Sequence, residues 1–423
     1  MERKSLYACA ASFLALTFAG QAAPARANGN ELISREAITV TADVRLAGAD
    51  GELSWIDGGF GKGRFDGSDD GGFRVRPALT ELALAWQPRF TWSLSGTVVA
   101  TAQHGQQHGV DLSESFLAYK PMADGPVRVS ARGGLFWPPV SLEHSGPEWA
   151  VTETITPSAI NSWIGEEVKV VGAEVTASRP VGDGRVSATV ALFGFNDTAG
   201  TLIAFRGWAL HDQKAVAFGK QPLPPLNAFF SRVQSHYTRP VIEIDKRVGY
   251  YAKIAWTPQA PVRIEALHYD NRGDPEAVNK SQEWGWRTRF ISLGAVVGVS
   301  SRLELRAQGM EGRTEMGHSR SGTIWADTRF RSVYLLATRK LGDSALSGRI
   351  EAFGARNDGG KLTSEDDEDG WAAAIAARHP ISPHATVLAE IGHVESRRGA
   401  RARRGLDPRQ QDISAQVALR LRL

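Results

Sequence analysis

Two-residue alternation runs through residues 38–46, ITVTADVRL, where apolar side chains alternate with Thr, Asp and Arg. Alternation with this period places one set of side chains on each face of a β-strand. The same pattern closes the sequence over residues 413–423, ISAQVALRLRL. No comparably long helical pattern competes with either stretch, so both are expected to be strands.

Between these two ends, short connections join pairs of alternating runs. They fall at 87–89, 121–125, 180–184, 257–261, 298–301, 340–344 and 379–384. Pro, Gly, Asp and Ser fill them because these residues supply the fixed or positive φ that a chain reversal needs. Longer polar connections alternate with them, at 48–72, 104–110, 137–165, 196–247, 270–283, 312–322, 357–370 and 397–410.

Short turns on one side and long loops on the other are typical of outer-membrane barrels. Seven turns join fourteen strands, and the first and last strands bring the number to 16. The sequence therefore predicts an all-β protein, a 16-stranded antiparallel transmembrane β-barrel with long extracellular loops. The connection 196–247 contains the apolar run 202–205, which we interpret as a helix or folded segment within a loop. If it holds a strand pair instead, the barrel has 18 strands.

The N-terminus has the three parts of a secretory signal. Arg3 and Lys4 precede an apolar stretch over 6–20, and Ala25-Arg26-Ala27 supplies a small-x-small cleavage pattern. We expect a signal peptide at 1–27 and a single barrel domain at 28–423, located in the cell outer membrane. Cys9 is the one cysteine in the sequence and would leave with the signal, so no disulfide would hold the barrel.

Charge and motifs exclude several other classes of function. The 423 residues include 49 Lys and Arg against 46 Asp and Glu, a net charge of +3, which argues against a nucleic-acid binder. His104 and His108 have a metal-ligand spacing, but Gly105 and Gly109 argue against the helix that such a site needs. We expect no metal, no cofactor and no catalytic site. The basic run 397–404 is expected to meet lipopolysaccharide at the loop side.

Side chains in the phase opposite the apolar one are expected to face the lumen, and arginine predominates among them. The predicted pore-lining residues are Arg45, Arg128, Arg132, Arg263, Arg287, Arg302, Arg306, Arg329, Arg331 and Arg349. A low-dielectric wall of one sign concentrates ions of the other sign, and the guanidinium fork suits carboxylate and phosphate oxygens. Two hypotheses stay open: the lumen favours anions, or these arginines pair with acids such as Glu304 and Glu351 and stiffen the wall.

Residues 133–169 form the most unusual segment, which begins GGLFWPPVSLE. Its four prolines prevent a continuous strand or helix. Its Trp and Ile content suits burial, so we expect 137–165 to fold inward as a constriction loop, the alternative being an exposed surface loop. The predicted constriction residues are Glu143, His144, Trp149, Trp163 and Glu166.

This segment also carries a resemblance to a known family. Residues 112–119 (LSESFLAY), 127–135 and 136–143 (FWPPVSLE) resemble the strand pair and first long inner loop of the phosphate-selective porin O/P family. The resemblance covers residues 112–175 and implies a 16-stranded, trimeric porin that passes small anionic or polar solutes. The loop here is acidic where the family has a lysine-rich constriction, which argues against phosphate specificity.

The leading hypothesis is a porin that allows passive diffusion of small hydrophilic solutes. A second hypothesis is an outer-membrane hydrolase with a Ser-His site on the outer wall, for which His268 and His393 are the candidates. A third is a structural or adhesion barrel with a closed lumen, which the long loops would also permit.

Overall fold

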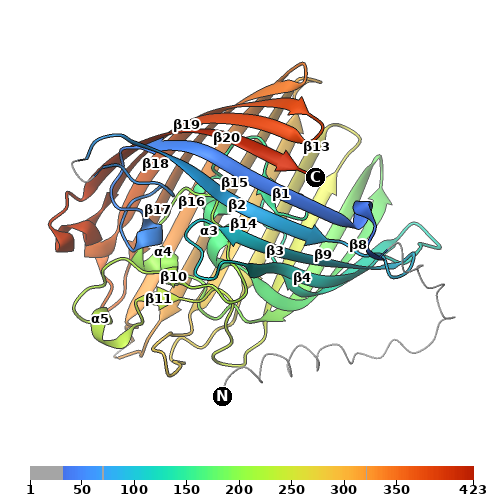
Figure 1. Cartoon of the computed structure of the whole chain (residues 1–423). Helices are drawn as coiled ribbons and strands as arrows, with labels where there is room; N and C mark the ends of the chain where they lie inside the picture. The colour runs from blue at the N-terminus through green and yellow to red at the C-terminus, as the bar shows by residue number, and fades with distance from the viewer. Residues whose placement is uncertain (1–31, 69–70, 321) are drawn as a thin grey trace.

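The computed structural model describes residues 32–68, 71–320 and 322–423, so the expected signal at 1–27 lies outside the described residues. Sixteen antiparallel strands form a closed barrel in which strands consecutive along the chain are neighbours in the wall. The barrel closes where β1 pairs with β20, shown as blue beside red in Figure 1. Among the described residues, no helix is both long and apolar enough to cross a membrane.

The strand bounds follow the predicted rhythm of short turns and long loops. The wall consists of β1 (Ile38–Ala49), β2 (Arg74–Trp86), β3 (Leu94–Gln103), β4 (Asp111–Tyr119), β5 (Arg128–Phe136), β8 (Val170–Val181), β9 (Gly184–Gly194), β12 (Gly249–Thr257), β13 (Val262–Asp270), β14 (Arg287–Gly298), β15 (Leu303–Met316), β16 (Ala326–Leu341), β17 (Ser344–Asn357), β18 (Glu368–Ser382), β19 (Ala385–Arg398) and β20 (Arg409–Arg422). The prediction of a 16-stranded barrel is confirmed.

The other elements lie in the long connections. They are the helices α3 (Ala159–Glu167), α4 (Thr201–Phe205) and α5 (Phe230–Val233), the short pairs β6 (His144–Ser145) with β7 (Ala150–Val151) and β10 (Gln221–Pro222) with β11 (Tyr237–Thr238), and the 3-10 turns η2 (Arg35–Ala37), η3 (Trp55–Asp57), η4 (Ser364–Asp366) and η5 (Gly399–Arg404). β9 pairs directly with β12, so the connection 195–248 adds no strand to the wall and the 18-strand alternative is wrong.

The alternation of the first and last strands sets their register at the closure. Val44 lies opposite Leu419 and Leu46 lies opposite Val417, and all four side chains are exposed on the outer wall. Asp43 and Arg45, in the other phase, are buried inside the barrel. At the closure, one face of the sheet is thus apolar and outward, and the other is polar and inward, as is typical of a barrel in a lipid bilayer.

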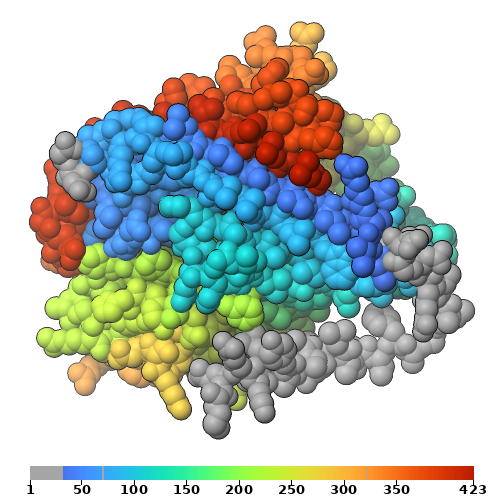
Figure 2. Space-filling model, in the orientation of Figure 1, coloured from blue at the N-terminus to red at the C-terminus, as the bar shows by residue number. Residues whose placement is uncertain are grey.

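The connection 195–248 covers the loop end of the barrel. Figures 1 and 2 show its yellow-green residues gathered at one end, beside the red loop that follows β19. Its apolar side chains, including Phe205, Leu223 and Phe230, pack with Trp286 and Met316 at the loop ends of the wall. The loop is therefore a packed cap with its own apolar cluster.

Candidate functional site

The chain after β5 turns into the lumen and stays there until β8 begins. β5 ends at Phe136, and Pro138 and Pro139 shortly after it prevent the strand from continuing, because proline cannot donate a hydrogen bond to a strand ladder. All nine residues of α3 are buried, and its Trp163 packs edge-on against Phe290 and Phe330 of the wall at ring distances of 5.5 and 5.1 Å. We call residues 137–169 the first inner segment.

Carboxylates fix the first inner segment at the start of α3. Glu143 accepts hydrogen bonds from the backbone N–H of Ser158 at 2.9 Å and from the Asn161 amide at 2.6 Å. It also forms an ion pair with Arg349 of β17 at 3.3 Å. Glu351, the wall residue two positions further along, accepts from the N–H of Ala159 at 2.6 Å. These acids meet the free N–H groups and positive dipole at the N-terminus of the helix.

The remaining predicted constriction residues fall into two groups. His144 stacks on Trp149 at 3.7 Å, and Trp149 stacks on Trp137 at 4.3 Å, near the turn-side face of the segment. Trp163 and Glu166 lie in the buried helix instead. Burial alone would raise the pKa of Glu166, but the ion pair with Arg206 and the contact with His211 lower it to about 2.

A second part of the chain also occupies the lumen, and no pattern in the sequence predicted it. Residues 206–217, which follow α4, run along the first inner segment and then reach the wall. The N–H of Ala215 donates to the carbonyl of Gly165, and the N–H of Ala217 donates to the carbonyl of Leu112 in β4, both at 2.8 Å. We call residues 206–217 the second inner segment. Gly200 makes its path possible, because φ is +103° there and a Cβ would lie within 3 Å of Thr288 and Thr314.

Ion pairs tie the second inner segment to the wall. Asp212 accepts from Arg64 at 2.9 Å and forms a short contact with Arg45 of β1. Lys214 lies 2.6 Å from Glu81 of β2. Burial would raise the pKa of Asp212, but the two guanidinium groups hold it well below its usual range.

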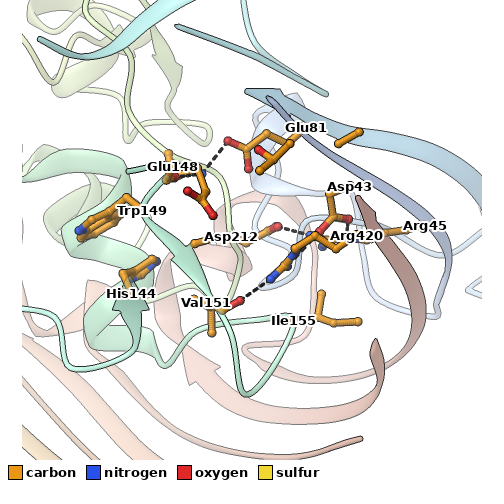
Figure 3. A pocket seen from close by; sticks show the side chains of 14 residues that line it. Asp43, Arg45, Glu81, His144, Glu148, Trp149, Val151, Ile155, Asp212 and Arg420 are labelled. Atoms are coloured by element: carbon orange, nitrogen blue, oxygen red, sulfur yellow. Dashed lines mark hydrogen bonds and ion pairs between the residues drawn. The ribbon is translucent and has the colours of Figure 1, made fainter. Parts of the chain in front are cut away.

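Both inner segments meet the wall at a narrow, charged gap beside β1, β2 and β20. Figure 3 shows Asp43, Arg45 and Arg420 of the wall facing Asp212 and the Val151 carbonyl, which accepts from Arg420 at 2.6 Å. The gap is lined by Thr41, Ala42, Asp43, Arg45, Glu81, His144, Glu148, Trp149, Ala150, Val151, Ile155, Asp212, Lys214 and Arg420. Its free volume of about 20 Å³ is room for roughly one water molecule.

Four of the predicted pore-lining arginines face inward and pair with a neighbouring carboxylate. The pairs are Arg45 with Asp43 at 2.6 Å, Arg132 with Glu174 at 2.8 Å, Arg306 with Glu304 at 2.7 Å and Arg349 with Glu351 at 2.8 Å. Each of these arginines also bonds to an inner segment. This geometry matches the hypothesis in which the arginines stiffen the wall.

Three further predicted arginines lie at the turn-side mouth. Arg128 begins β5 and Arg302 immediately precedes β15, and both side chains are exposed. Arg263 near the start of β13 pairs with Glu265 at 2.5 Å.

The prediction is wrong for Arg287, Arg329 and Arg331, which lie in the outward phase. In β16 the inward side chains are Thr328, Phe330 and Ser332, all buried, and the arginines between them are exposed. The sequence interpretation assumed that apolar residues face lipid along the whole strand. Near the loop end, however, apolar wall residues face inward because they pack on Trp163 and Trp208 of the inner segments.

His268 and His393, the candidates for a hydrolase, lie on the outer wall. His268 contacts Tyr250 and His393 contacts Trp371, with ring centroids 5.6 and 5.1 Å apart. Within the part of the chain that the structure describes, neither histidine is hydrogen-bonded to a serine. The geometry gives the hydrolase hypothesis no support.

Comparison with known proteins places the fold. No protein-family model matches the chain, and no curated protein matches it. Among solved structures, the outer membrane channel DcaP of Acinetobacter baumannii aligns over 92% of this chain and 99% of its own, with a TM-score of 0.55 and 12% identity. The anion-selective porin from Comamonas acidovorans aligns over 91% of this chain and 98% of its own, with a TM-score of 0.52 and 9% identity. The chain therefore has the fold of outer-membrane barrels.

Proposed function

We propose that the protein is an outer-membrane porin that allows restricted diffusion of small hydrophilic solutes, with a preference for anions. The outward apolar face, the closed barrel and the likeness to DcaP and to the anion-selective porin support this proposal. Export through a signal at 1–27 and assembly as a homotrimer belong to the same proposal and remain predictions.

One observation carries it: the inner segments pack closely on the wall around Trp163 but leave a charged gap beside β1, β2 and β20. Trp163 and its neighbours pack on apolar wall residues such as Phe330, Tyr334 and Leu336. On the side of β1, β2 and β20, the contacts are charged, as with Arg45 and Asp212. Because water and hydrated solutes enter polar gaps and avoid packed apolar ones, the solute path runs along the charged side.

The anion preference rests on the turn-side mouth. Arg128 and Arg302 have no carboxylate within ion-pair distance among the described residues, whereas the arginines deeper in the lumen are paired. Unpaired positive charge at a mouth raises the local anion concentration. Reversal potentials of the refolded chain in planar bilayers under a KCl gradient test this directly. We expect anion selectivity that falls in the Arg128→Gln, Arg302→Gln variant; cation selectivity of the wild type contradicts the preference.

Cysteine scanning tests the path itself, since Cys9 is the only native cysteine. Thr41→Cys places a thiol in the charged gap, and Ser332→Cys places one on the opposite, inward-facing wall. A charged thiol reagent should block conductance through the first variant and leave the second unchanged. Block of both variants, or of the second alone, rules out this path.

A closed barrel with a structural or adhesive role is the second candidate. The complete burial of α3 and the small free volume of the gap favour it. Single-channel recording separates the two, because a closed barrel gives no conductance steps in wild-type protein at any salt concentration.

A further inference from the structure

Arg329, one of the three arginines that point outward against the prediction, belongs to an ordered row of arginines on the outer wall. Arg289 of β14 lies directly opposite Arg313 of β15, Arg313 lies opposite Arg329 of β16, and Arg329 lies opposite Arg356 of β17. All four alternate with buried inward residues and so point outward. We call these four residues the arginine row.

The arginine row lies on the loop side of the outward apolar surface. Along their strands, Arg289 is two residues from Ile291, Arg329 four from Val333 and Arg356 six from Ile350, and these three apolar side chains are more than half exposed. With a rise of about 3.3 Å per residue, the Cα atoms of these arginines lie roughly 7 to 20 Å along the strand from those apolar residues. That is where lipid headgroups begin when the apolar surface lies in the hydrocarbon.

Five carboxylates contact the four arginines of the arginine row, Asp367 beside Arg356 among them, but they do not use up all the N–H donors. Arg289 and Arg313 contact Glu315 at 3.6 and 3.1 Å, and Arg313 also contacts Asp327 at 2.6 Å. Arg329 lies 3.7 Å from Asp358 and Arg356 lies 2.8 Å from Asp369. Each guanidinium carries five N–H donors, so most donors stay open to a second acceptor. Like charges directly opposite each other are destabilising, which favours an anion shared between them.

A hollow adjoins the arginine row on the same outer surface. It has a volume of about 650 Å³ and is lined by Arg247, Val248, Tyr250, Asp270, Arg272 and Arg287. Asp270 lies directly opposite Arg289 in the sheet, so the hollow and the row are continuous. Arg287 and, beside the row, Arg331 have no carboxylate within ion-pair distance in the described ranges.

The basic run 397–404, which is expected from its sequence to meet lipopolysaccharide, is largely engaged in contacts within the protein. Arg398 and Arg401 are buried, next to Glu368 and Glu52, and Arg403 pairs with Asp366. These contacts engage three of the five arginines of the run, and Arg397 and Arg404 are exposed.

We propose that the arginine row and the adjoining hollow bind the phosphate groups of a phosphorylated glycolipid of the outer leaflet, that is, lipopolysaccharide. The guanidinium forks take the phosphate oxygens, which they match in geometry and charge. The saccharide lies in the hollow against Tyr250, and the acyl chains lie on Ile291, Val333 and Ile350. The inference is independent of whether the lumen conducts.

Binding of fluorescent rough-type lipopolysaccharide to the refolded chain in nanodiscs tests the proposal. The quadruple variant Arg289→Gln, Arg313→Gln, Arg329→Gln, Arg356→Gln should bind it about tenfold or more weakly, the loss expected when charge-assisted hydrogen bonds to phosphate are removed. Dephosphorylated lipopolysaccharide should bind the wild type as weakly as intact lipopolysaccharide binds the quadruple variant. Excess inorganic phosphate should not displace lipopolysaccharide from the wild type.

The matched control removes four exposed arginines from the turn side: Arg35→Gln, Arg89→Gln, Arg179→Gln, Arg339→Gln. It changes the net charge equally and should leave binding unchanged. Equal loss in both quadruple variants overturns the proposal, as does unchanged binding in the arginine-row variant. Binding that EDTA abolishes but the arginine substitutions do not also overturns the proposal. The lipid would then be bound through divalent cations held by the carboxylates. Folding is verified by heat-dependent gel mobility, and if the quadruple variant does not fold, the single Arg329→Gln variant decides by the same criteria.

Discussion

Glu167 is the buried carboxylate that joins the two inner parts of the chain. It lies at the end of α3 and accepts hydrogen bonds from the Trp163 indole at 2.6 Å and from the N–H of Leu202 in α4 at 2.9 Å. Burial raises its pKa to about 7, although these hydrogen bonds lower it. No cation forms an ion pair with it among the described residues, so ionisation places an unpaired charge in the core.

The raised pKa of Glu167 predicts that stability falls as the pH rises. Below pH 4.5, its ordinary pKa, the carboxyl is protonated in both the folded and the unfolded state; between 4.5 and about 7 only the unfolded state loses its proton. The free energy of unfolding therefore falls progressively between pH 4.5 and about 7, by about 3 kcal/mol in all. Thermal unfolding from pH 4 to 9 measures it, and the Glu167→Gln variant should lose this part of the pH dependence. An equal slope in both proteins contradicts the assignment.

Glu143 is expected to be the most sensitive single residue of the first inner segment. The Glu143→Ala variant leaves the N–H of Ser158 and the Asn161 amide without an acceptor and removes one partner of the buried Arg349. We expect a loss of about 3 kcal/mol, typical of breaking a buried pair. Glu304→Ala breaks the more exposed pair with Arg306 and should cost under about 1 kcal/mol. Urea unfolding compares the two; similar losses contradict the prediction.

At the scale of elements, the second inner segment acts as a strap across the lumen. Asp212 and Lys214 connect it to β1 and β2, and its backbone bonds to the first inner segment. Releasing the strap widens the charged gap while the barrel wall stays intact. In the proposed porin, the free cross-section of the solute path is therefore set by two ion-paired contacts of a loop that begins at the far side of the barrel.

The Asp212→Asn, Lys214→Gln variant should conduct at least about twofold more than the wild type, because pore conductance rises with the free cross-section that charged wall contacts now restrict. Single-channel recordings of the refolded protein measure this. Arg247→Gln, in the same connection but on the outer surface, is the control and should leave conductance unchanged. Unchanged conductance in the double variant would show that the strap does not limit flow.

At the scale of the whole molecule, the outward apolar surface decides where the barrel can reside. Leu293 of β14 is outward and 59% exposed, and Leu335 and Ile350 on nearby strands are similarly placed. The charged side chains of the middle of the wall point to the lumen, where carboxylates pair with arginines, and apolar side chains meet the bilayer core. The molecule is thus a cylinder with an apolar outer surface, and its nearly filled interior is apolar around Trp163 and charged beside β1, β2 and β20.

Leu293→Arg should therefore destabilise the barrel in a bilayer by about 2 to 4 kcal/mol, the cost of arginine near the middle of the lipid face. Val278→Arg, in the exposed loop after β13, should change stability by less than about 0.5 kcal/mol. Equilibrium unfolding by guanidinium in lipid vesicles gives both values. A small effect at Leu293 would place it outside the hydrocarbon.

The sequence by itself determined the wall. Period-two alternation and the difference between short turns and long loops predicted sixteen strands and their closure, because both signals are local and every strand carries its own. It also located the first inner segment, through the prolines and aromatic residues of 137–165.

Only the tertiary structure decided what fills the lumen and which arginines face it. Arg45 pairs with Asp212 across 167 positions of sequence, and no local pattern reports such a contact. The same distant packing brings Trp163 and Trp208 against Phe330 and makes the inner wall apolar near the loops. Local hydrophobicity there indicates the wrong face, so the sequence assigned Arg287, Arg329 and Arg331 to the lumen. The side of the wall that faces lipid depends on everything that has folded inside it, and that is a property of the whole chain.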